Sequence, residues 1–196
     1  MHEAAGDPNT FAHVRVALGI IVGLGITRLL TGLARFVAHP GRQKPDAVHL
    51  LWVASVLLLL LHFWWWQFSL ARVVTWHFGL FAFVAAYAAL CYLLCALLFP
   101  DDIAEYAGYG DYFLSRRRWF FGLLAAVVVF DAIDTTLKGP ARWQELGPEY
   151  VASLMVHLLL YGVAAWVSRR SFHLAFAAAV LVYQASWILR LYDVLG

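Results

Sequence analysis

Long apolar runs without a charged residue dominate this sequence. Residues 47–71 and 73–100 contain no Asp, Glu, Lys or Arg over 25 and 28 positions, and residues 150–168 and 171–189 contain none over 19 positions each. A helix of about 20 such residues crosses the hydrocarbon core of a bilayer, which is roughly 30 Å thick. The runs are apolar on every face and do not alternate, so they predict spanning helices rather than strands of a membrane barrel.

Clusters of breaker and charged residues divide the chain into six predicted spans. Examples are HPGRQKP at 39–45, FPDD at 99–102 and SRRS at 168–171, because Gly, Pro and grouped charges commonly end a helix. We therefore expect one transmembrane domain, an all-α integral membrane bundle of about six helices. The predicted spans are about 12–37, 47–70, 75–99, 113–137, 149–168 and 171–194.

Two segments between the spans predict short helices that lie in the membrane interface. The loop at 101–115 carries Tyr106, Tyr109 and Tyr112, which are three residues apart, and tyrosine favours the interface of a bilayer. The second segment is residues 140–146. No part of the chain suits a separate soluble domain.

The composition favours a membrane protein and excludes nucleic acid as a partner. Charged residues make up 13% of the chain and apolar residues 63%, whereas a soluble domain carries about 25% charged residues. The net charge is +2, and no stripe of Lys and Arg suggests a nucleic-acid surface. The first ten residues lack a basic region typical of a secretory signal, so we expect the first span to be retained. The lipid bilayer is the expected partner.

The distribution of basic residues predicts the orientation. One side of the membrane receives eight of them, namely Arg35, Arg42, Lys44, Arg116, Arg117, Arg118, Arg169 and Arg170. The other side receives five, namely Arg15, Arg72, Lys138, Arg142 and Arg190. Because cytoplasmic loops are enriched in Lys and Arg, both termini are expected outside the cytoplasm.

Small residues form a ridge on the first predicted span. Gly19, Gly23, Thr27 and Thr31 are four residues apart, and such ridges let membrane helices approach closely. Two interpretations remain open. The ridge packs against another span of the same chain, or it contacts a membrane-protein partner or a second copy.

Arg28 is a charged residue inside the first predicted span. It lies about 10 Å from Arg35 along a helix. A buried arginine suggests a function by default, but at this depth the side chain also reaches the headgroups by snorkelling. The sequence leaves both interpretations open.

The fourth span carries two acidic residues near its outer end. Asp131 and Asp134 are three residues apart and share a face, and Lys138 is four residues after Asp134, which suits an ion pair along a helix. Asp131 lies about 10 Å below Lys138. At that depth a carboxylate needs a partner or water.

Other ionisable residues match the depth of these aspartates. Arg15 and Arg190 fall near the outer ends of the first and sixth spans, and His62 and His157 lie about 10–15 Å from the outer surface in the second and fifth. Together with Asp131 and Asp134, they predict an outer-half polar cavity formed by five helices. The alternative is a set of structural ion pairs.

Histidines on different spans also allow a haem site. His62 and His157 could ligate the iron of haem b through their imidazole nitrogens, and His49 and His173 could form a second pair. This is an alternative, because eight histidines on six helices readily produce depth-matched pairs. We predict no cofactor and no metal site.

The sequence lacks the usual signatures of a soluble enzyme. It contains no phosphate loop, dinucleotide fingerprint, HExxH or GxSxG motif. The first hypothesis is therefore a non-enzymatic membrane protein that binds or conducts a small solute or a proton through the polar cavity. The second is an accessory subunit of a membrane complex, and the third is a haem b or quinone-binding electron-transfer protein.

Several motifs resemble a known family. GLGITRLLTGL at 23–33, HLLW at 49–52, HFWWWQF at 62–68 and RRWFFGLLA at 117–125 are similar to motifs in a family of small, multi-spanning bacterial membrane proteins without an assigned function. The similarity covers most of the chain. It implies a compact helical bundle in a bacterial inner membrane and carries over no activity or catalytic residue.

Overall fold

The computed structural model describes residues 8–39, 44–72 and 76–192, which form helices and connecting turns without a strand. The helices are α1 (Pro8–Ala38), α2 (Ala47–Trp66), α3 (Phe78–Leu98), α4 (Tyr109–Leu137), α5 (Pro140–Trp166) and α6 (Arg170–Tyr192), and a short 3-10 helix, η1 (Gln67–Arg72), follows α2. All six α-helices are long and apolar enough to cross a membrane. The prediction of an all-α, six-span protein is confirmed to this extent.

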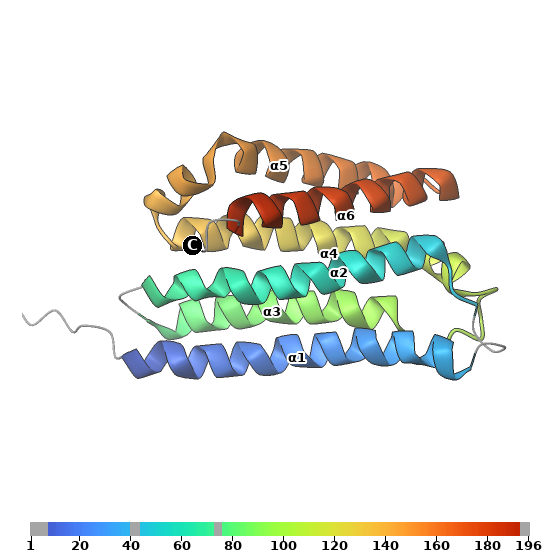
Figure 1. Ribbon diagram of the computed structural model, residues 1–196, viewed down its shortest axis with the longest axis horizontal. Coiled ribbons are helices and arrows are strands. Elements are labelled where there is room, and N and C mark those ends of the chain that lie inside the picture. Colours follow the sequence, from blue (N-terminus) through green and yellow to red (C-terminus); the bar gives the residue numbers. More distant parts are fainter. Residues whose placement is uncertain (1–7, 40–43, 73–75, 193–196) are drawn as a thin grey trace, which may run out of the picture.

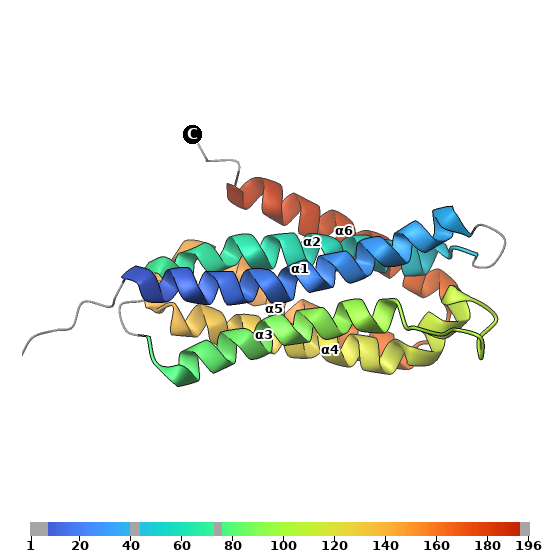
Figure 2. The ribbon, with the colours of Figure 1, turned by 90° about the horizontal axis from the view of Figure 1, so that it is seen from below.

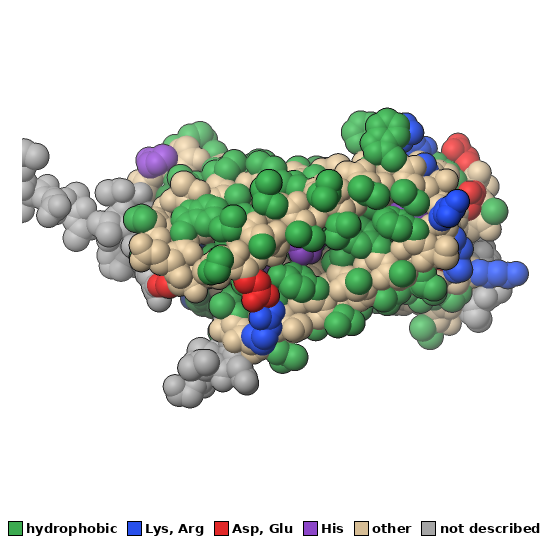
Figure 3. Space-filling view, turned by 90° about the horizontal axis from the view of Figure 1, so that it is seen from above, with side chains coloured by type: hydrophobic (Ala, Val, Ile, Leu, Met, Phe, Trp, Pro, Cys, Tyr) green, Lys and Arg blue, Asp and Glu red, His purple; other side chains and the backbone are tan. Residues whose placement is uncertain are grey.

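The helices form two layers of three. One layer contains α1, α2 and α6 with α2 in the middle, and the other contains α3, α4 and α5 with α4 in the middle (Figures 1 and 2). Between the layers, α1 packs on α3, and α2 packs on both α3 and α4. The described ends of the chain lie at the same end of the bundle, which we call the terminal end. The other end, where Arg35, Arg116 and Arg170 lie, is the basic end (Figure 3).

Two glycines on α1 allow it to pack closely on α3 and on the residue that follows α3. A Cβ on Gly32 would come within 2.3 Å of the Phe99 ring, and one on Gly25 would lie 3.2 Å from the Cys95 sulfur. These glycines lie on the same face as the buried Leu18. Close approach through small residues is a common means of packing membrane helices, because burying apolar groups away from lipid gains little.

Asp46 joins three helices at the basic end. Its Oδ1 accepts hydrogen bonds from the backbone N–H groups of Val48 and His49, and its Oδ2 accepts one from Arg170 at 2.7 Å. Burial raises the pKa of Asp46, but these bonds outweigh it and hold the pKa below its usual value. Gly110 of α4 leaves room for this carboxylate, because a Cβ there would lie 2.8 Å from it.

The predicted interface helix at 101–115 is wrong. Residues 101–108 form turns and bends, and α4 begins at Tyr109. Tyr109 and Tyr112 are buried rather than at a surface, and the Tyr112 hydroxyl donates to the Leu97 carbonyl at 2.7 Å. The three-residue spacing therefore reflects the first turn of a spanning helix.

The predicted short helix at 140–146 is present, but it is joined to the fifth span. Gly147 has φ +69, ψ −175, which is not helical, and it bends α5 between residues 140–146 and the segment that starts at Pro148. A left-handed φ favours glycine, since it has no Cβ. The predicted boundaries of the other spans differ from the helices by a few residues, and the second span ends as η1 instead of α-helix.

The helices α5 and α6 follow one another in the chain but pack on different neighbours. α5 packs on α4, and α6 packs mainly on α2. Figure 2 shows α6 diverging from the rest of the bundle toward the terminal end. The backbones of α5 and α6 are therefore not tightly packed on each other.

Candidate functional site

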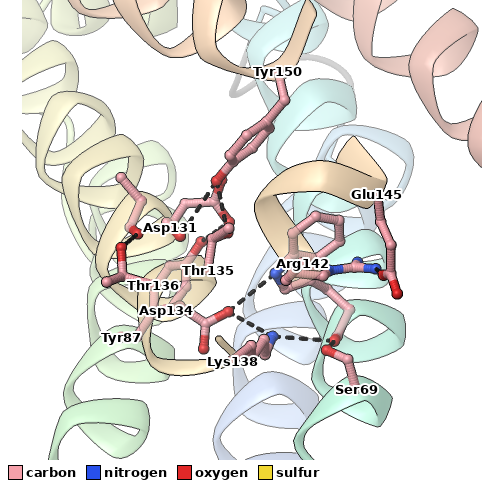
Figure 4. A network of polar contacts seen from close by, with 12 residues as sticks. Ser69, Tyr87, Asp131, Asp134, Thr135, Thr136, Lys138, Arg142, Glu145 and Tyr150 are labelled. Carbon is pink, nitrogen blue, oxygen red and sulfur yellow. Dashed lines mark hydrogen bonds and ion pairs between the residues drawn. The ribbon is translucent and has the colours of Figure 1, made fainter. Parts of the chain in front are cut away.

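The Asp131 carboxylate lies at the meeting point of α3, α4 and α5. Its Oδ2 accepts a hydrogen bond from the Tyr150 hydroxyl at 2.7 Å, and its Oδ1 accepts one from the Tyr87 hydroxyl at 3.3 Å (Figure 4). The Thr135 hydroxyl lies 2.8 Å from the Tyr150 hydroxyl and can donate to it. Among the described residues, no Lys, Arg or His forms an ion pair with Asp131.

One helical turn away, Asp134 makes a closed ion pair. Its Oδ2 accepts from the Lys138 ammonium at 2.5 Å and from the Trp66 indole N–H at 3.0 Å. The Lys138 and Asp134 side chains are 2% and 1% exposed. Burial lowers the pKa of Lys138, and the Asp134 carboxylate opposes that shift. The predicted pairing of these two residues is present in the structure.

Trp66 is held on several sides by these polar groups. It is the last residue of α2, and its carbonyl accepts from Lys138 at 3.3 Å and from the Ser69 hydroxyl at 2.7 Å. These bonds add side-chain donors to a carbonyl at the C-terminal end of α2. The Arg142 guanidinium lies 4.2 Å from the centroid of the Trp66 ring, which is a cation–π contact.

The bend in α5 positions two of these residues. Residues 140–146 place Arg142 against Trp66, and the chain then turns at Gly147 so that Tyr150 enters the first turn of the spanning segment. Tyr150 is buried and reaches Asp131 from there. The bend thus lets one element contact both Trp66 of α2 and Asp131 of α4.

A cavity of about 140 Å³ lies between α2, α3, α4, α5 and α6. We call it the Asp131 cavity. Its polar lining residues include His62, Asp131, His157 and Gln184, and most of the rest of its wall is aromatic and aliphatic. Both α5 and α6 contribute side chains to it. Figure 3 shows a histidine side chain near the middle of the molecule, among mostly hydrophobic side chains and close to a pair of acidic and basic ones.

The cavity includes three of the six residues predicted for it. Asp131, His62 and His157 line it, although they come from three different helices. Asp134 lies beside it and is turned toward Lys138 and Trp66. The depth estimated from the sequence therefore grouped His62, Asp131 and His157, which line the same cavity.

The two predicted arginines lie outside the cavity. Arg190 makes a bidentate ion pair with Glu149, with N···O distances of 2.8 and 2.6 Å, and both side chains are about half exposed. Arg15 lies 5.9 Å from the centroid of the Phe68 ring. Neither guanidinium lines the Asp131 cavity.

The histidines have defined hydrogen-bond partners. His157 Nδ1 lies 2.7 Å from the Ser153 carbonyl, and because a carbonyl only accepts, Nδ1 carries the proton. In the neutral ring, Nε2 is then an acceptor. His62 packs edge-on against Trp66, with ring centroids 5.4 Å apart. A cavity of this size holds a haem only if its walls move, so the haem alternative stays a prediction.

The second histidine pair considered for haem does not share a cavity with the first. His49 and His173 are buried near the basic end, and their Nε2 atoms bond to the carbonyls of Leu98 and Val167 at 2.8 Å each. In the described part of the chain, no three His, Cys, Asp or Glu side chains are grouped as a metal site would require.

Arg28 is anchored at the basic end. Its Nε donates to the Phe99 carbonyl at 3.0 Å, and its Nη2 pairs with Asp101 at 2.7 Å. The side chain is 28% exposed. The partners lie in the loop after α3, toward the basic end, which agrees with the snorkelling interpretation of this residue.

The small-residue ridge of α1 is divided. A Cβ on Gly19 would lie 3.0 Å from the Trp64 ring, whereas one on Gly23 would meet nothing within 4 Å. Thr27 and Thr31 are exposed. Only the first member of the ridge therefore packs within the bundle, and the glycines that contact α3 and the segment after it, Gly25 and Gly32, lie on a different face.

Three residues of the site were missed by the sequence analysis. Tyr87 and Tyr150 hold Asp131, and Gln184 lines the cavity. Tyr87 and Gln184 are isolated polar residues within apolar runs, which is the usual signal for an inward-facing intramembrane residue. Tyr150 sits at a span boundary, where tyrosine is common for other reasons.

Comparisons of this chain with protein-family models, with curated proteins and with solved structures found no match.

Proposed function

We propose that this protein binds a small polar molecule or a proton in the Asp131 cavity and conducts it through the outer half of a bacterial inner membrane. The proposal rests on one observation. Asp131 lines a cavity, and its carboxylate is held by two tyrosine hydroxyls without a basic partner among the described residues.

The chemistry of a carboxylate in a membrane supports a functional interpretation. An unpaired charge within hydrocarbon is costly, and such residues commonly mark a binding site or a pathway for protons. Asp134 shows how the same side chain is neutralised when its role is structural. Asp131 lacks that arrangement, so a proton, water or a ligand has to supply the missing interaction.

The arrangement of basic residues supports the orientation. Arg35, Arg116 and Arg170 lie at the basic end, and we place this end in the cytoplasm by the positive-inside rule. Both termini then face the other side, and the Asp131 cavity lies in the outer half of the bilayer.

Proton flux into liposomes that contain the purified protein tests the proposal. An internal pH-sensitive dye reports the collapse of an imposed pH gradient. We expect Asp131→Asn to reduce the protein-dependent rate at least about tenfold, since the amide cannot exchange a proton in this range. Glu149→Gln is the matched control, because Glu149 is a carboxylate on the same end of the bundle that pairs with Arg190 outside the cavity. An unchanged rate in Asp131→Asn would remove Asp131 from the pathway.

A second function, docking of another membrane helix on α1, is favoured by the exposed part of the ridge. Space is open at Gly23, and Thr27 and Thr31 are exposed. This surface suits close helix contact with a partner protein or a second copy. Gly23→Leu should then change the oligomeric state or release a co-purifying protein, without changing proton flux. An unaltered assembly in this variant would exclude the docking role.

A further inference from the structure

We propose that the ligand of the Asp131 cavity is a small organic cation, namely an ammonium group with apolar substituents. This inference rests on the proposed function and assigns the ligand's chemical class. Three features of the cavity support it: the hydrogen-bonding groups that line it, the aromatic walls, and the size.

Three of the residues that line the cavity carry hydrogen-bond acceptors. The Asp131 carboxylate has lone pairs beyond those used by the two tyrosines. In its neutral ring, His157 has Nε2 as an acceptor, because the Nδ1 proton is used by the Ser153 carbonyl. The Gln184 carbonyl oxygen is buried and has no hydrogen-bond partner in the described part of the chain. A ligand that donates hydrogen bonds or carries a positive charge complements these groups.

The tyrosine hydroxyls do not reverse this preference. The Tyr150 and Tyr87 protons both point to Asp131, so neither is available to a ligand carbonyl. A quinone or another uncharged acceptor would have to compete with the carboxylate for them. Both carboxylate oxygens accept a hydrogen bond, which suits the ionised form of Asp131.

Aromatic rings form much of the cavity wall. Phe63, Tyr161, Tyr183 and Trp187 all line it, and Tyr183 and Trp187 stack with centroids 6.4 Å apart on α6. Aromatic faces attract cations through their quadrupoles, and this attraction grows when the cation is shielded from water. The combination of one carboxylate and several rings is what an alkylammonium group requires.

The size of the cavity limits the ligand. A buried cavity of about 150 Å³ accommodates benzene, and the Asp131 cavity measures about 140 Å³. Leu59, Leu154 and Ile188 also line the cavity, from α2, α5 and α6. Apolar substituents on the cation suit such a wall.

Choline and its uncharged carbon isostere, dimethylbutanol, provide a direct test. The two probes have the same shape, and only choline carries a charge. We expect titration of the purified protein, followed by tryptophan fluorescence, to show choline binding at least about tenfold tighter than dimethylbutanol. Asp131→Asn should abolish this difference, whereas Glu149→Gln should retain it. Equal binding of the two probes would overturn the proposal.

A second variant keeps the test informative if Asp131→Asn does not fold. Gln184→Glu adds a carboxylate of nearly the same shape inside the cavity, so it should tighten choline binding several-fold and leave dimethylbutanol binding unchanged. Weaker or unchanged choline binding in this variant would contradict the proposal.

Separate outcomes distinguish the ligand class from the function. If neither probe binds the wild-type protein but proton flux still depends on Asp131, the proposed ligand class is wrong and the proposed function stands. If Asp131→Asn changes neither probe binding nor proton flux, both proposals fail.

Discussion

Asp131 and Asp134 lie one turn apart on the same helix, yet their surroundings differ in kind. Asp134 is 1% exposed and is matched by the Lys138 ammonium and the Trp66 indole. Asp131 receives two tyrosine hydroxyls and opens onto a cavity. The first arrangement gives the carboxylate a cationic partner, although Asp134 Oδ1 is buried without a hydrogen-bond partner among the described residues. The second arrangement holds a carboxylate that has no basic partner. Buried ionisable groups in one membrane segment therefore need not share a role.

The largest effect on stability is expected from breaking the ion pair between Lys138 and Asp134. Lys138→Met leaves the Asp134 charge buried without a partner, and such removal costs about 3–5 kcal/mol of unfolding free energy. Unfolding in mixed micelles, followed by tryptophan fluorescence, measures this loss. The double variant Lys138→Met with Asp134→Asn should recover most of it. A small loss in the single variant would show that water reaches Asp134, and the contrast with Asp131 would disappear.

A smaller loss of unfolding free energy is expected when the Trp66 indole is replaced. Trp66→Phe removes the N–H donor to Asp134 and keeps an aromatic ring beside the cavity. A hydrogen bond to a charged group contributes about 1.5–3 kcal/mol, so the same unfolding assay should show a decrease of this size. Trp65→Phe serves as the control because Trp65 is 43% exposed. Equal effects of the two substitutions would argue against the Asp134 contact.

Substitutions of the two tyrosines that donate to Asp131 test the surroundings of this carboxylate in the same way. Tyr150→Phe removes the 2.7 Å bond to Asp131 and the contact with Thr135, and we expect a loss of about 1 kcal/mol, since cavity water can replace the donor. Tyr87→Phe removes a longer bond, at 3.3 Å, and should cost less. Both variants should also change the Asp131-dependent proton flux. Altered stability with unaltered flux would make these bonds purely structural.

The smallest effect is expected outside both networks. Arg190→Gln breaks an ion pair with Glu149 whose members are about half exposed, and exposed pairs contribute little to stability. We expect neither the unfolding midpoint nor proton flux to change measurably. A clear loss of flux would place Arg190 back in the pathway, as its depth in the sequence first indicated.

Much of the fold follows from the sequence because lipid imposes strict requirements on the backbone. Charge-free runs have to form helices when they cross a membrane, and six helices of sufficient length and hydropathy are present. The errors occurred where tertiary contacts decide. Tyr109 and Tyr112 extend α4 because they are buried, and this burial cannot be inferred from their spacing alone.

Only part of the candidate site could be predicted from the sequence. Counting residues along a span gives the depth of a side chain in the bilayer, but not the direction in which it points. His62, Asp131 and His157 have similar heights and also face the same space. Arg15 and Arg190 have comparable heights, but they point away from it and contact Phe68 and Glu149. The bend at Gly147, which aims Tyr150 at Asp131, depends on a backbone dihedral that the local Gly-Pro sequence only suggested.

The separation of α5 from α6 has a consequence for how the site is filled. Side chains of both helices line the Asp131 cavity, and both helices are apolar enough to span a membrane, so a guest that enters between them would come from the surrounding lipid rather than from bulk water. Its effective concentration is then its membrane partition coefficient multiplied by its concentration in solution. Amphiphilic guests are enriched in the lipid before they touch the protein, so the bilayer itself performs the first step of selection.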